Sequence, residues 1–283
     1  MKAASLALLL GLFFLACDDE SGIKPPTHVS GFTGTITFSG AWPEDTDQIR
    51  LAAALRFPPS TIADILLGDA LPTGVDSIRY SFYTDPVALQ AVGVVWKEKG
   101  QAWDATNIIG YYFPTENHLS PGAVTVSRKD EMVQNIDILC DLTKVKRRVN
   151  SAIGGMLRVQ GAWPPGASKV VVAASTAPLL PTSLLDLFFS FPIDAGFDST
   201  RYIIPVQPGT YKLVAALVIE EGKSIGLESI KGAYYNFSGI KISNPETIKL
   251  DVDLNLIFPA ATRRGGQKQA LPGALTATSR RGE

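Results

Sequence analysis

The sequence contains one unit twice, and this internal repeat restricts the possible folds more than any other feature. At a shift of 122 residues, Asp76-Ser-Ile-Arg-Tyr80 aligns with Asp198-Ser-Thr-Arg-Tyr202. The motif Gly40-Ala-Trp-Pro43 matches Gly161-Ala-Trp-Pro164 at a shift of 121. A period of this length is too long for a solenoid repeat and has the size of a small domain. The sequence therefore predicts two copies of one domain.

The two copies are expected over residues 31–146 and 152–258. With 283 residues, of which 46% are hydrophobic and 19% charged, the chain can build two ordinary hydrophobic cores. The formal net charge of -1 argues against a nucleic-acid partner, because such a partner requires a surplus of cations. We therefore expect no nucleic-acid binding.

The N-terminus has the features of a lipoprotein signal peptide over residues 1–16. Lys2 precedes the apolar run Leu6 to Leu15, which is too short for a permanent membrane span. Ala16-Cys17 resembles the end of a bacterial lipobox, in which the cysteine is acylated and becomes the new N-terminus. The alternative is an ordinary signal peptide with an incidental cysteine. A lipid of the palmitate type on Cys17 would anchor the protein to a membrane of the cell envelope.

Residues 17–30 are expected to form an extended tether between the lipid and the first domain. The acidic run Asp18-Asp-Glu20 leaves three interpretations open. It resembles an inner-membrane retention signal of proteobacteria, it resembles a surface-export signal of Bacteroidetes-like bacteria, or it is a solvated part of the tether. We expect the outer membrane, with the protein on its periplasmic or its outer face.

Each copy alternates apolar and polar residues with period two, which is typical of half-buried strands. In the first strand Phe32, Ile36 and Phe38 share one face. About seven such strands per copy, at short spacing, favour an antiparallel Greek-key β-sandwich. The stretch Tyr211 to Ile219 is apolar on both faces, which indicates a central strand. The fold class is therefore all-β, with two tandem antiparallel Greek-key β-sandwich domains.

A short helical insert is expected in each copy. Ser60 to Leu67 and Thr182 to Phe189 both begin with a capping residue and continue with apolar residues at helical spacing. This pattern predicts about two helical turns at one end of each sandwich. Because both inserts are apolar and lie between strands, the alternative is that they cover a sheet edge.

Each copy, from about its first strand to its last, resembles the carboxypeptidase-regulatory or transthyretin-like family of β-sandwich domains. The resemblance rests on Pro208-Gly-Thr-Tyr211 before an alternating strand and on a last strand, 247–256, that carries Asp251 and Asp253. In the first copy, whose last strand is expected over 135–142, Pro86-Val-Ala-Leu89 replaces the Gly-Thr-Tyr motif. The resemblance implies a non-catalytic stalk, adaptor or binding module and assigns no functional residues.

Three further segments carry simple expectations. Cys140 lies in a strand-like run and is expected to be a buried small hydrophobe rather than a reactive thiol. The basic stretch Thr143 to Asn150 is expected to be a solvated connector rather than a phosphate site. Residues 259–283 are small, polar and basic and predict a disordered tail.

The sequence offers no pattern typical of catalysis, cofactor binding or metal binding. His28 and His118 are too few and too far apart in the chain for a metal cluster or a triad. Asp64 and Asp186 recur between the copies, but both lie in the amphipathic inserts, where a solvent-facing position explains them. We expect no enzyme, no cofactor and no metal.

Aromatic residues are the remaining candidates for a binding site. Four of them surround one hairpin of the first copy and have largely aliphatic counterparts in the second: Trp96, Trp103, Tyr111 and Tyr112. They are the candidate ligand-binding residues. Trp42 and Trp163 precede a proline at a strand end, where a ring either stacks on a sugar or plugs the sandwich, and we favour the plug.

Two functions follow from these patterns. The first is a non-enzymatic, membrane-anchored envelope lipoprotein that acts as a structural or adaptor module. The alternative is a surface lipoprotein that binds a glycan or another envelope protein through the aromatic hairpin. The hairpin function requires exposed rings, because a buried ring cannot stack on a ligand.

Lipidation of Cys17 can be tested directly. The N-terminal peptide of the mature protein is expected to begin at Cys17 and to carry acyl groups, which mass spectrometry detects. A Cys17→Ser variant is the control and should not be acylated. An unmodified N-terminus downstream of Cys17 would contradict the prediction.

Overall fold

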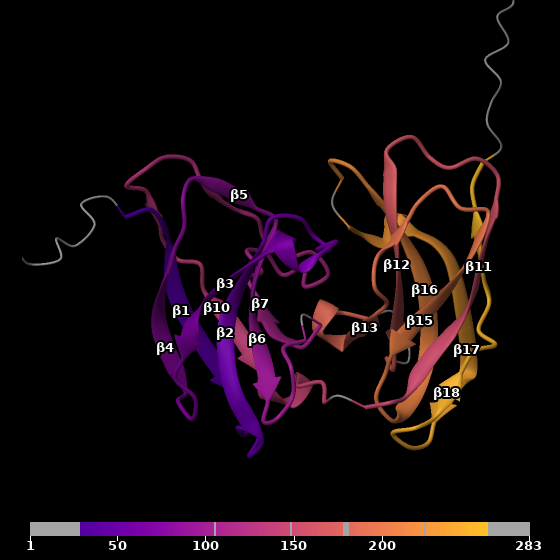
Figure 1. The fold of residues 1–283 in the computed structure, drawn as a ribbon, viewed down its shortest axis with the longest axis horizontal. Helices are drawn as coiled ribbons and strands as arrows, with labels where there is room; N and C mark the ends of the chain where they lie inside the picture. Colours follow the sequence, from indigo (N-terminus) through magenta and orange to yellow (C-terminus); the bar gives the residue numbers. More distant parts are fainter. Residues whose placement is uncertain (1–28, 105, 148, 178–180, 224, 260–283) are drawn as a thin grey trace, which may run out of the picture.

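The computed structural model describes residues 29–104, 106–147, 149–177, 181–223 and 225–259. It is an all-β structure with short 3-10 turns and several sheets (Figure 1). The signal peptide, Cys17, nearly all of the tether and nearly all of the predicted tail lie outside the described residues. Over the described ranges, no helix is long and apolar enough to cross a membrane.

The strands fall into two groups that follow each other along the chain and lie side by side (Figure 1). The first group comprises β1 (Gly31–Ser39), β2 (Thr46–Ala54), β3 (Ile65–Leu71), β4 (Ser77–Tyr83), β5 (Val87–Leu89), β6 (Ala91–Glu98), β7 (Ile108–Tyr111), β8 (Val124–Val126), β9 (Met132–Val133) and β10 (Ile138–Asp141). The second group comprises β11 (Ala152–Gln160), β12 (Ala167–Ser175), β13 (Leu187–Phe189), β14 (Ile193–Asp194), β15 (Ser199–Pro205), β16 (Gly209–Glu220), β17 (Ile230–Ile242), β18 (Ile248–Lys249) and β19 (Leu254–Ile257).

In each group two main sheets enclose one hydrophobic core. The first group has the strand orders β10-β1-β4 and β3-β2-β6-β7, and the second has β15-β11-β18 and β13-β12-β16-β17. Strands β9 and β19 pair with β1 and β11, and β14 pairs with β12. One core contains Phe32 and Ile36 of β1 together with Leu51 of β2. The other contains Leu157 of β11 together with Val214 of β16.

Equivalent side chains make equivalent contacts in the two groups. The Nε1 of Trp42 donates to the carbonyl of Val75 at 3.1 Å, and the Nε1 of Trp163 donates to the carbonyl of Phe197 at 3.1 Å. Each indole is partly buried against the core of its own group. These contacts match the plug interpretation of both tryptophans and the register of the internal repeat. The domain boundaries themselves stay a prediction.

The last strand of each group pairs in parallel with its neighbour, whereas antiparallel pairing was expected. Strand β10 pairs with β1 in parallel, with Ile36 opposite Ile138, and β19 pairs with β11 in parallel. The strands before them, β9 and β18, already pair in parallel with β1 and β11, so each last strand continues in the direction of the first strand. The sheets β10-β1-β4 and β15-β11-β18 are therefore mixed, and the expectation of purely antiparallel sheets was wrong.

The last strands are also interrupted, which the predicted ranges 135–142 and 247–256 did not foresee. A carboxylate replaces a backbone acceptor at the break: Thr35 N donates to Asp137 Oδ1 at 2.7 Å, and Met156 N donates to Asp253 Oδ1 at 2.8 Å. The tyrosine of each repeat motif reinforces the break. The hydroxyl of Tyr80 donates to the carbonyl of Ile136 at 2.6 Å.

The predicted helical inserts are single 3-10 turns, η2 (Ile62–Asp64) and η4 (Leu184–Asp186). In the first insert Asp64 Oδ2 accepts from the backbone of Ser60 and Thr61, at 2.8 and 3.0 Å. Strands β3 and β13 follow immediately and pair with β2 and β12. Sheet pairing satisfies the backbone of these short segments better than a second helical turn, so the alternative of a covered sheet edge was the better one.

Two local expectations are confirmed. Strand β16 lies between β12 and β17, so the doubly apolar stretch is a central strand. Cys140 is fully buried in the first core, and burial raises the pKa of its thiol. A thiol that stays protonated is a poor nucleophile.

Gly155 offers a test of how the last strand of the second group packs. A Cβ at this position would lie 2.2 Å from the carbonyl oxygen of Val252, whereas a Cβ at Gly209 would meet ordinary contacts at 3.6 Å and beyond. Gly155→Ala should therefore lower the free energy of unfolding by about 1–3 kcal/mol. Urea unfolding of this variant beside Gly209→Ala measures the difference. Equal stability of the two variants would refute this packing.

Candidate functional site

The structure separates the four candidate aromatic residues. Trp96 is fully buried in the first core, and its Nε1 donates to Thr46 Oγ1 at 2.9 Å. Tyr112 is half-buried and packs against the same core. The ring of Trp96 therefore cannot stack on a ligand, and this part of the hairpin prediction was wrong.

Trp103 and Tyr111 instead line one cleft. The ring of Tyr111 meets Phe57 edge to face with centroids 5.9 Å apart, and it meets Phe113 at the same distance. The guanidinium of Arg50 lies 5.6 Å from the centre of the Trp103 ring. Burial raises the pKa of the Tyr111 hydroxyl, so this hydroxyl stays neutral.

The cleft has a volume of about 730 Å³ and lies between the two groups of strands. Its first wall includes Phe57, Trp103 and Tyr111, and its second wall includes Leu187 and Leu217. A smaller pocket of about 100 Å³ adjoins it and shares the first wall. The cleft is concave and mostly apolar, and sequence spacing alone did not reveal it.

Contacts between the two groups border the cleft. Leu184 and Leu187 form a cluster with Phe57, Tyr111 and other residues of both groups. The backbone N–H of Leu184 donates to the carbonyl of His118 at 2.9 Å. The His118 ring is stacked on Phe113, with ring centres 4.7 Å apart. His118 thus has a structural position at the junction.

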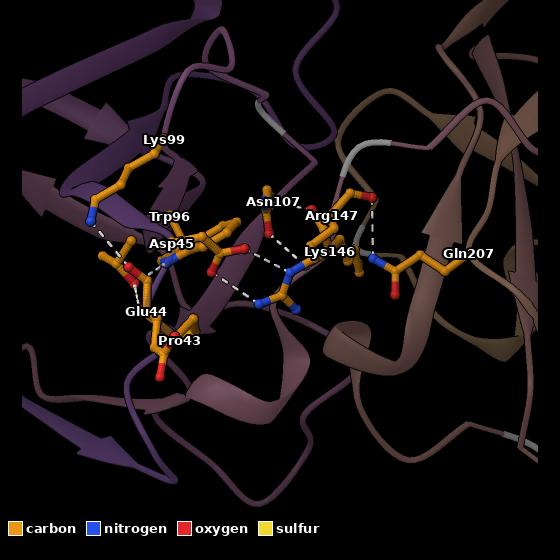
Figure 2. Close-up of polar contacts among 10 residues, drawn as sticks. Pro43, Glu44, Asp45, Trp96, Lys99, Asn107, Lys146, Arg147 and Gln207 are labelled. Atoms are coloured by element: carbon orange, nitrogen blue, oxygen red, sulfur yellow. Dashed lines mark hydrogen bonds and ion pairs between the residues drawn. The ribbon is translucent and has the colours of Figure 1, made fainter. Parts of the chain in front are cut away.

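The connector between the groups is bonded on both sides, as Figure 2 shows for Arg147. The Arg147 side chain donates to the two carboxylate oxygens of Asp45 at 2.8 and 2.9 Å, and its carbonyl accepts from Gln207 Nε2 at 3.3 Å. Lys144 Nζ donates to Asp186 Oδ1 at 2.7 Å. The connector is therefore solvated only in part: Thr143, Arg147 and Asn150 are exposed, but its cations also bond both groups. The recurring carboxylate Asp186 is a partner of the connector.

Lys146 is one of the two connector cations that line the cleft, together with Arg147. Its Nζ donates to the carbonyl of Leu187 at 2.6 Å and lies 5.1 Å from the centre of the Phe188 ring. Its backbone is fixed by Asn107, whose side chain bonds both the N–H and the carbonyl of Lys146, at 2.8 and 2.7 Å (Figure 2). Burial lowers the pKa of Lys146 to about 8, although Asp104 and Asp186 act in the opposite direction.

Several cleft residues of the second group were missed because they lie in the apolar insert. The run Leu184-Leu-Asp-Leu-Phe-Phe189 has more large apolar residues than a solvent-facing turn needs. That excess was the available signal. Lys146 had no such signal, because its burial results from contacts made by both groups. Over the described residues, no cluster of histidine, cysteine or acidic side chains is suited to hold a metal ion.

Comparisons with known proteins give only distant likenesses. No protein-family model matches the chain, and no curated protein matches it. Among solved structures, a leucine-rich repeat protein from Bacteroides thetaiotaomicron is 11% identical with a TM-score of 0.31. The match covers 82% of this chain, which spans only 27% of that protein.

Two further solved structures come from the same bacterial genus. A candidate adhesin from Bacteroides ovatus is 7% identical, with a TM-score of 0.23 and coverage of 81% of this chain and 87% of that protein. A candidate cell adhesion protein from Bacteroides fragilis is 10% identical, with a TM-score of 0.23 and coverage of 83% and 93%. Likenesses at these scores carry no argument about the function of this chain.

The burial of Lys146 predicts a pH dependence of stability. Because the pKa is lower in the folded protein than in the unfolded chain, the unfolded chain binds more protons between the two values. The free energy of unfolding should therefore rise by about 1–2 kcal/mol from about pH 7 to about pH 9.5, relative to a Lys146→Met variant. Urea unfolding of both proteins across this range measures the change. If the difference in the free energy of unfolding between the two proteins does not change with pH, the buried position of the amine is contradicted.

Proposed function

We propose that this protein is a non-enzymatic lipoprotein of the cell envelope that acts as a structural or adaptor module. The observation that carries the proposal is the connector, which bonds both groups of strands and fixes them against each other. Lys144 and Lys146 bond residues of the second group, and Arg147 bonds Asp45 of the first and Gln207 of the second. A stiff unit of this kind suits a protein that holds a partner at a set distance from a membrane.

Several features of the sequence support the same function. The segment that ends in Ala16-Cys17 has the pattern of a lipoprotein signal, and the resemblance of the two copies is to modules that serve as stalks or adaptors. In this proposal lipid on Cys17 anchors the protein at the outer membrane, and two transthyretin-like domains, 31–146 and 152–258, form the stiff body. Protease shaving of intact cells distinguishes the outer face from the periplasmic face.

The stiffness of the junction can be measured in solution. Leu184 is buried in the cluster between the groups and lies outside both main cores, so Leu184→Asp should loosen the junction and leave the cores folded. Small-angle X-ray scattering should then show a larger radius of gyration and a broader distance distribution than in wild type. Phe237→Asp is the matched control, because Phe237 is 82% exposed.

Two results would overturn the proposal. Scattering that already requires freely moving groups in the wild type would remove the stiff body on which the proposal rests. Turnover of a substrate by the purified protein would remove the non-enzymatic role.

A further inference from the structure

The cleft between the two groups of strands has the size and lining of a small-molecule site. Its volume of about 730 Å³ lies within the range of about 300–1,000 Å³ that is typical of such sites. Small-molecule sites are also common where two compact units meet. The stiff junction described above gives this cleft a fixed shape, since both walls are tied to the connector.

The walls favour an aliphatic ligand. Six aromatic residues and a larger number of aliphatic ones line the cleft, and the aromatic residues are Phe57, Trp103, Tyr111, Phe188, Phe189 and Phe191. Large apolar side chains also remain open to solvent at the cleft, where Ile62 is 82% exposed and Phe191 is 75% exposed. Apolar residues outnumber polar ones in this lining, which suits an aliphatic chain better than a sugar, because sugar hydroxyls require many hydrogen-bond partners. An aliphatic chain would instead cover the apolar surface that is now exposed to water.

Two cations line the cleft, Lys146 and Arg147, and because Arg147 is already paired with Asp45, Lys146 is the one that selects the other end of the ligand. The Nζ of Lys146 has three N–H donors, and its one hydrogen-bond acceptor among the described residues is the carbonyl of Leu187. No carboxylate of the described ranges lies within ion-pair distance of this ammonium. The one acidic residue of the lining, Asp104, already accepts from Thr106 N and Oγ1 at 2.8 and 2.7 Å. A carboxylate on the ligand would supply further acceptors for this ammonium.

We infer that the cleft binds a free long-chain carboxylate, with its aliphatic chain between the two walls and its carboxylate at Lys146 Nζ. This site is independent of the spacer role, because a stiff junction does not require an open cleft. The site also revises the aromatic hairpin hypothesis: Trp103 and Tyr111 take part as apolar walls, while Trp96 and Tyr112 belong to the core.

Calorimetric titration with octanoate, decanoate and dodecanoate, each below its micelle concentration, tests whether the cleft binds the aliphatic chain of the ligand. Affinity should rise about fourfold for each added methylene, because burial of one methylene is worth about 0.8 kcal/mol. Phe191→Glu should weaken the binding of dodecanoate at least about tenfold, because it places a negative charge at the apolar part of the cleft. Phe237→Glu is the matched control and should bind like wild type, since Phe237 is exposed and lies outside the cleft lining.

The carboxylate contact is tested with a neutral ligand of the same length. Wild type should bind decanoate about tenfold more tightly than decanol, and Lys146→Met should abolish this preference while still binding decanol. An affinity that does not depend on chain length would overturn the site. Equal effects of the two glutamate variants would overturn its location, and equal binding of decanoate and decanol by wild type would overturn the role of Lys146.

Discussion

The short connector after β10 fixes the arrangement on which the rest of the molecule depends. Leu142 is buried in the first core, and Lys144, Lys146 and Arg147 after it bond residues of both groups of strands. A hydrated linker would leave the two groups free to reorient, because exposed cations gain little from single surface ion pairs. Here Lys146 is held by Asn107 through its backbone and by Leu187 through its side chain. The cleft exists because this connector holds its two walls at a fixed separation.

The parts of the fold that were predictable are those encoded by local pattern. Alternation in β1 and the doubly apolar stretch of β16 gave strands of the right kind, because each strand buries one or both faces along its own length. The repeated Gly-Ala-Trp-Pro motif located two tryptophans that make the same hydrogen bond. The contacts of these tryptophans lie close to the strand end that the motif marks, so the motif alone was enough to predict their positions.

The parts that were not predictable depend on residues far apart in the chain. The parallel pairing of β10 with β1 follows from the path of the whole chain. It could not be predicted because apolar and polar residues alternate in the same way in parallel and antiparallel strands. The short inserts lead into edge strands because their backbone pairs with β2 and β12. The spacing of residues in the sequence does not show that these two strands have an edge available for pairing. Trp96 and Trp103 are close in sequence, yet Trp96 is in the core because β6 is buried on both faces, whereas Trp103 follows the end of β6 and lines the cleft.

The cleft is the feature that a purely structural role leaves unexplained. A junction that only has to be stiff is most stable when its apolar side chains close on one another, because an unfilled apolar cavity loses the contacts its lining would otherwise make. Leu184 and Leu187 show that such closure is available at this junction, since they pack directly against residues of the first group. Beside them the walls stay apart, and the desolvated Lys146 amine has a single acceptor within the part of the chain that the structure describes. Both features oppose stability in the empty protein, and a ligand with an aliphatic chain and an anionic end would relieve both.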